Sequence, residues 1–185
     1  TAGTSNFRAG VNAGDSIASG GNFNVVVGDD AGTAITTGDN NTALGYQALK
    51  TENANSNNTA IGHQALKDQD GGDGNTAVGS FAIHDLTNAS RATAVGSYAG
   101  FSSQGADDVT FIGHNTGLFA TTAAYSVFVG SKAGQGITGT KLTGNHNVAI
   151  GFSAGLLLQG TATENVLVGS YAGDAITTGS ENVCM

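Results

Sequence analysis

The chain has 185 residues, of which 39% are hydrophobic and 11% charged, and it contains 30 glycines but no proline or tryptophan. This composition excludes a helical bundle and a disordered tail, and a formal net charge of −8 without any cluster of Lys and Arg excludes nucleic acids and anionic membranes as partners. No stretch reaches the ~18 apolar residues that span a bilayer, so we expect no membrane insertion by this segment.

A short pattern that closes with glycine recurs along the whole chain, starting with the degenerate copy NFRAG at 6–10. The later copies are NVVVG (24–28), NTALG (41–45), NTAIG (58–62), NTAVG (75–79), ATAVG (92–96), VTFIG (109–113), SVFVG (126–130), NVAIG (147–151) and NVLVG (165–169). From Gly28 to Gly130, successive closing glycines are 17 residues apart. A unit of this length is too short for two helices and their turns, but it holds short strands and turns.

The repeat therefore predicts an all-β fold, a parallel β-solenoid of about ten 17-residue coils that fills 1–185 as a single domain. The closing glycines are expected to stack in one line along the axis. The interval between Gly130 and Gly151 is 21 residues, and its segment 135–146 is expected to bulge outward as a loop. The chain ends within a repeat at 180–185, which predicts a fragment of a longer fibrous protein.

A small residue follows each closing glycine at a fixed distance. Alanine stands three residues after the glycine in nine of the ten copies, with Thr116 as the exception, and the next residue is glycine or aliphatic. This pattern predicts a tight corner after each strand. Asparagines recur at the start of the pattern, where we expect a ladder of amide side chains that bond neighbouring coils or cap turns. They are Asn24, Asn41, Asn58, Asn75, Asn147, Asn165 and Asn182.

Side chains alternate between the two faces of a strand, so the residue before each glycine and the one two earlier share a face. These two columns are aliphatic or threonine, and we expect them inside the coil. The residue between them then points outward, although it is almost always apolar. This stripe comprises Val26, Ala43, Ala60, Ala77, Ala94, Phe111, Phe128, Ala149 and Leu167. An exposed apolar stripe needs a cover, which predicts a homo-oligomer.

Two copies, NVAIG (147–151) and SVFVG (126–130), resemble the [Asn/Ser]-Val-Ala-Ile-Gly repeats in the head domains of trimeric autotransporter adhesins. The longer copies NNTALGYQAL (40–49) and NNTAIGHQAL (57–66) are similar to repeats of phage tail-fibre proteins. The resemblance covers nearly the whole chain and implies a trimer of left-handed parallel β-rolls. Adhesin heads commonly use a shorter unit, so the 17-residue period favours the fibre.

Catalytic and cofactor chemistry find little support in the sequence. His63, His84, His114 and His146 are expected to be separate surface residues, so we expect no enzyme, no cofactor and no metal site. GGDGN (71–75) resembles one unit of a calcium-binding repeat but occurs once. The acidic corners Asp29–Asp30, Asp68–Asp70–Asp73 and Asp107–Asp108 offer oxygen ligands for Ca²⁺, but are expected to be solvated turns.

Two further surface functions are suggested by residue types that recur in several coils. The column Thr42, Thr59, Thr76, Thr93 and Thr110 resembles the threonine arrays of ice-binding solenoids, although its aliphatic neighbours are expected in a core. Tyr46, Phe81, Tyr98, Phe152 and Tyr171 offer stacking surfaces for sugars, or simply pack the corners.

The sequence thus predicts a rigid spacer or receptor-facing part of a phage tail fibre, found on the virion. The alternative is the head of a bacterial surface adhesin, outside the cell, and a minor alternative is an ice-binding solenoid. The partners expected are other copies of the chain and a host-surface glycan or protein receptor. Contacts with a receptor are expected in the segments that vary between coils, 67–74, 101–108, 118–125 and 135–146.

Overall fold

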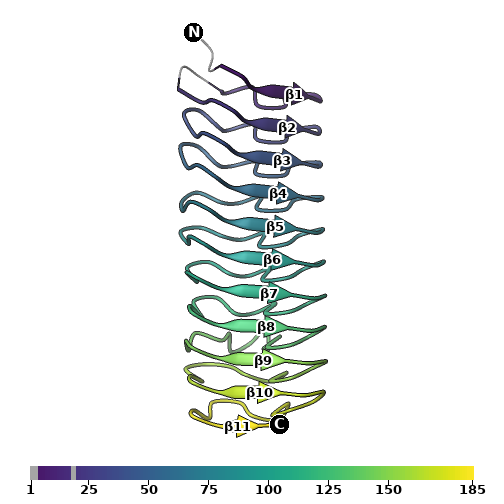
Figure 1. The fold of residues 1–185 in the computed structure, drawn as a ribbon, viewed down its shortest axis with the longest axis vertical. Helices are drawn as coiled ribbons and strands as arrows, with labels where there is room; N and C mark the ends of the chain where they lie inside the picture. The colour runs from purple at the N-terminus through teal and green to yellow at the C-terminus, as the bar shows by residue number, and fades with distance from the viewer. Residues whose placement is uncertain (1–3, 18–19) are drawn as a thin grey trace.

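A computed structural model describes residues 4–17 and 20–185 and confirms the parallel β-solenoid (Figure 1). One sheet of 11 parallel strands runs along the stack, and each strand pairs with the next one in the sequence. The strands are β1 (Phe7–Ala9), β2 (Val25–Val27), β3 (Thr42–Leu44), β4 (Thr59–Ile61), β5 (Thr76–Val78), β6 (Thr93–Val95), β7 (Thr110–Ile112), β8 (Val127–Val129), β9 (Val148–Ile150), β10 (Val166–Val168) and β11 (Val183–Cys184). Strands β1 and β11 lie at opposite ends of an elongated stack.

The closing glycines form one line along the stack, as predicted. A Cβ atom built on Gly62 would lie 2.4 Å from the carbonyl oxygen of Gly79, and the same contact repeats in each coil from Gly10 to Gly151. Gly62 has φ +137°, which side chains rarely adopt. Glycine is therefore required here both by its backbone angle and by the close approach of the next coil.

The tight corner after each strand is also confirmed. Four residues after the closing glycine the backbone is left-handed, with φ +58° at Gly117 and +52° at Leu49. The alanine before this position is buried, as at Ala48 and Ala65. Thr116 fits the same place because its hydroxyl donates a 2.6 Å hydrogen bond to the carbonyl of Gly130.

The expected assignment of the strand faces is wrong. Every residue of the expected outward stripe is fully buried inside a single chain; these residues are Val26, Ala43, Ala60, Ala77, Ala94, Phe111, Phe128, Ala149 and Leu167. The columns expected in the core point outward instead, and Leu44 and Ile112 are 45% and 40% exposed. Alternation separates two faces, but both faces of this strand are apolar, so hydrophobicity alone did not identify the inner one.

In several coils the interior is filled by pairing a large residue with a small one. Where the middle strand residue is Ala43, the corner residue opposite is the buried Leu49. Where the strand residue is Phe111, the corner residue is Gly117, on which a Cβ would lie 2.7 Å from the phenyl ring. The narrow interior has room for one large side chain from either source, because protein cores are close-packed.

The asparagine ladder is confirmed by hydrogen bonds from coil to coil. The amide oxygen of Asn24 accepts the backbone N–H of Asn41 at 2.8 Å, and the oxygen of Asn41 accepts that of Asn58 at 2.9 Å. The side-chain nitrogen of Asn24 donates to the carbonyl of Gly38 at 2.9 Å. These residues are fully buried, so each amide satisfies backbone groups that water does not reach.

The inserted segment 135–146 leaves the stack over a shorter stretch than expected. Leu142 is buried and forms parallel bridges with both Ala120 and Gly160, so the ladder is restored before the segment ends. The continuously exposed run is 138–141, and Thr143 and His146 are exposed singly. The prediction of an outward bulge is thus confirmed for 138–141 only.

Candidate functional site

The outward face of the sheet is a strip of two columns that runs from β1 to β11. One column holds Thr42, Thr59, Thr76, Thr93 and Thr110 in its middle and valine in β2 and β8 to β11. The other is aliphatic, with Val95 39% and Ile150 39% exposed. The strand register places equivalent residues side by side, as in Thr42 opposite Thr59 and Leu44 opposite Ile61. No residue of β2 to β11 on this face carries a charge.

The acidic corners are held by hydrogen bonds within the stack. The carboxylate of Asp73 accepts the backbone N–H of Ser56 at 2.7 Å, and Asp107 accepts that of Ser90 at 2.8 Å. The N–H of Asp73 in turn donates to the hydroxyl of Ser90 at 3.2 Å. Aspartate and serine therefore alternate along one turn column, where they link coils.

Asp108, the neighbour of Asp107, forms a bidentate pair with the guanidinium of Arg91 at 2.6 and 2.8 Å. The hydrogen bonds from Arg91 lower the pKa of the Asp108 carboxyl. These contacts give Asp73, Asp107 and Asp108 structural roles in linking neighbouring coils.

A band of aromatic and histidine rings follows one side of coils three to seven. The rings of Tyr46 and His63 stack with centroids 5.5 Å apart, and Phe81 and Tyr98 stack at 4.9 Å. Phe101 continues the band at 5.5 Å from Tyr98. The band ends in an open groove with a volume of about 430 Å³, lined by Tyr98, Phe101, His114, Asn115, Leu118 and Phe119.

The groove is apolar on its floor and polar at His114 and Asn115, a combination that suits a flat ligand with hydroxyl groups. Tyr98 is one of the aromatic residues for which the sequence left two roles open, stacking on sugars or packing the corners. Phe101, Leu118 and Phe119 fall in the variable segments 101–108 and 118–125. The groove does not include any residue of the outward sheet face.

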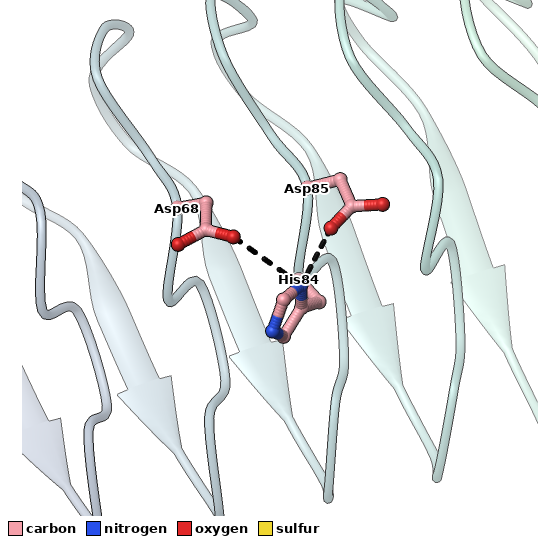
Figure 2. Close-up of side chains that lie close together, drawn as sticks. All are labelled: Asp68, His84 and Asp85. Carbon is pink, nitrogen blue, oxygen red and sulfur yellow. Dashed lines mark hydrogen bonds and ion pairs between the residues drawn. The ribbon is translucent and has the colours of Figure 1, made fainter.

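Three ionisable side chains converge at one point, contrary to the expectation that the polar residues stay apart (Figure 2). The Nδ1 atom of His84 lies 2.5 Å from Oδ1 of Asp85 and 3.6 Å from Oδ2 of Asp68. The His84 side chain is 12% exposed, whereas those of Asp68 and Asp85 are 41% and 35% exposed. Within residues 4–17 and 20–185, this is the single group of three His, Cys, Asp or Glu side chains within metal-binding reach.

The other histidines do not join this group. His63 lies between Tyr46 and Phe81, and His146 stacks on Tyr125 with centroids 5.1 Å apart. His114 lies at the groove. Sequence reasoning assigned Asp68 to an acidic corner and His84 to the surface. The available signal was the 17-residue spacing of Asp68 and Asp85, which is one coil.

No family model, no curated protein and no solved structure matches this chain. In the part of the chain that the structure describes, no helix is long and apolar enough to cross a membrane.

Proposed function

We propose that the chain is a structural or adhesive segment of a fibre, a rigid spacer or receptor-facing part of a phage tail fibre. The observation that carries the proposal is the uninterrupted ladder of 11 parallel strands with an uncharged, apolar outward face. Stacked coils make a stiff rod, because each coil bonds to the next along its whole length. The repeats' resemblance also supports the alternative, a head domain of a bacterial surface adhesin.

The occupant that we propose for the outward sheet face is another copy of the same chain. Exposed columns such as that of Leu44, Val95 and Ile150 expose about 40% of each side chain. The two columns continue through all the strands, so the same contact would repeat in every coil along the rod. A strip without charges suits a dry contact, since charged residues are depleted in interface cores.

A trimer of left-handed β-rolls is the assembly that the resemblance favours. Three such strips facing a common axis would remove the apolar surface from water along the full rod. The groove and the aromatic band lie outside the strip and would stay accessible in this assembly.

Leu44→Asp is expected to weaken or abolish self-association, because it places a charge in the apolar contact. Leu157→Asp is the matched control, since Leu157 is also exposed (37%) but lies off the strip, in the surface column of Asp68 and Asp85. Light scattering should give a trimer for the unmodified chain and the control, and a smaller mass for Leu44→Asp. A stable monomer of the unmodified chain at micromolar concentration would contradict the proposal.

Ice binding is the second candidate, because the aliphatic neighbours of the threonine column are at least partly exposed and not in the core. The threonine column Thr42 to Thr110 and its aliphatic neighbours share one outward face with regular, in-register spacing. The same face cannot bind ice and be covered by other chains. A monomer that produces thermal hysteresis would therefore favour this function over the fibre.

For the receptor-facing role, we propose that the groove binds a carbohydrate. The exposed ring of Tyr98 offers an aromatic face, and His114 and Asn115 supply polar groups nearby. On a glycan array, Tyr98→Ala is expected to lose the glycans that the unmodified chain binds. Tyr125→Ala, at an exposed tyrosine outside the groove, should keep them. Equal binding by both variants would place the contact elsewhere.

A further inference from the structure

We propose that Asp68, His84 and Asp85 bind a divalent transition-metal ion of the zinc type. This inference is independent of the fibre function. The three side chains offer one imidazole nitrogen and two carboxylate oxygens that all lie within 4.8 Å of one another. Figure 2 shows both carboxylates directed at the same edge of the imidazole ring.

The donor types favour zinc over calcium. Imidazole nitrogen and carboxylate oxygen are common ligands of Zn²⁺, at about 2.0–2.2 Å, whereas Ca²⁺ prefers six to eight oxygen ligands. Ligand atoms around a tetrahedral zinc ion are about 3.3 Å apart. The 3.6 Å separation of His84 Nδ1 and Asp68 Oδ2 is already close to this value. The 2.5 Å contact between His84 and Asp85 must lengthen slightly.

The Nδ1 atom of His84 is the ring nitrogen that faces both carboxylates. It can coordinate an ion through its lone pair, as metal binding to a neutral imidazole requires. Water molecules would complete the coordination, because both carboxylates are partly exposed.

The stack holds the three ligands in place. The His84 ring stacks on Phe101 with centroids 5.1 Å apart and an interplanar angle of 19°, which fixes its orientation. The backbone N–H of Asp68 donates to the carbonyl of His84, and that of Asp85 donates to Phe101, each at 3.0 Å. These bonds belong to the ladder between coils, so the ligands do not depend on a flexible loop.

Lys67 pairs with one carboxylate oxygen of Asp68 and leaves the other oxygen available to the site. Its ammonium nitrogen lies 3.3 Å from Oδ1 of Asp68, while the other oxygen, Oδ2, faces His84. Asp68 can therefore keep its ion pair and still offer one oxygen to a metal. The two carboxylates and one ammonium leave a local charge that favours a cation.

Isothermal titration calorimetry with ZnCl₂ on the tag-free chain tests the proposal. The unmodified chain is expected to bind one Zn²⁺ per chain and to melt at a higher temperature when the ion is present. The double variant Asp68→Asn, Asp85→Asn keeps the side-chain shapes and should bind at least about tenfold more weakly. His84→Asn should do the same, with His63→Asn as the control that binds like the unmodified chain.

The circular dichroism spectrum of each variant shows whether it is folded. If His84→Asn does not fold, zinc binding by the isosteric double variant Asp68→Asn, Asp85→Asn decides the result. Binding that persists in the folded double variant, or the absence of saturable binding at one ion per chain, would overturn the proposal. Equal competition by Ca²⁺ would also contradict it, because it would exclude the imidazole as a ligand.

Discussion

Gly62→Ala is expected to destabilise the chain by about 3 kcal/mol or more, the size of effect that follows from forced backbone strain in a packed structure. The added Cβ would lie 2.4 Å from the carbonyl oxygen of Gly79, at a backbone φ of +137°. The neighbouring coil cannot move away easily, because the N–H of Gly79 is bonded to the carbonyl of Ile61 at 2.7 Å. The glycine line is therefore a part of the solenoid that tolerates no side chain.

Thermal unfolding followed by circular dichroism measures this effect, at one protein concentration because self-association would shift the midpoint. A loss of this size corresponds to roughly 10 °C in a chain of this length. Gly139→Ala is the matched control, since a Cβ there meets nothing within 4 Å. Gly74→Ala separates the two causes, because it has φ +70° but open space, and should cost only about 1 kcal/mol. If Gly62→Ala melted like Gly139→Ala, the contact between the glycines would not exist.

The coil length and the stacking were predictable from the sequence because each column repeats its chemistry. Three kinds of residue have the places that the sequence indicated: the glycine at a fixed interval, the alanine three residues later and the asparagine at the entry to the strand. Parallel pairing of successive coils then follows, because it is the arrangement that places equal residues side by side.

The direction of the strand faces was not predictable from hydrophobicity, since both faces are apolar. A signal was nevertheless present in the exchange of large and small residues between two columns. Ala43 is paired with Leu49, whereas Phe111 is paired with Gly117. Residues that compensate each other in volume share one cavity, which identifies the middle strand column as the inner one.

To predict that Asp68, His84 and Asp85 converge, the directions of the side chains must be known as well as the 17-residue period. The 17-residue spacing places Asp68 and Asp85 in one column, but does not show that both carboxylates turn toward His84. That arrangement depends on the orientation of the imidazole, which stacking on Phe101 holds. A surface site built across two coils is therefore visible only in three dimensions.

Phe111→Ala is expected to cost about 3–5 kcal/mol, because it leaves a cavity in a coil interior that has no other large side chain at this place. Phe111 is fully buried and stacks on Phe128 with ring centroids 5.6 Å apart. Phe111→Asp should prevent folding, since an unpaired charge would be buried. It should not yield a folded monomer, as an outward stripe would have predicted. Denaturant unfolding measures the first variant and circular dichroism the second.

The effect of Gly117→Leu on stability is then expected to differ in sign between the unmodified chain and the Phe111→Ala variant. In the unmodified chain it should destabilise, because a Cβ on Gly117 would already lie 2.7 Å from the ring of Phe111. In Phe111→Ala it should recover about half of the lost stability, because it recreates the pairing of Ala43 with Leu49, where leucine stands at φ +52°. The double-mutant cycle from four unfolding curves gives the coupling energy between the two positions. A coupling of zero would mean that the two residues do not share one space, and the inner position of the Phe111 column would then be wrong.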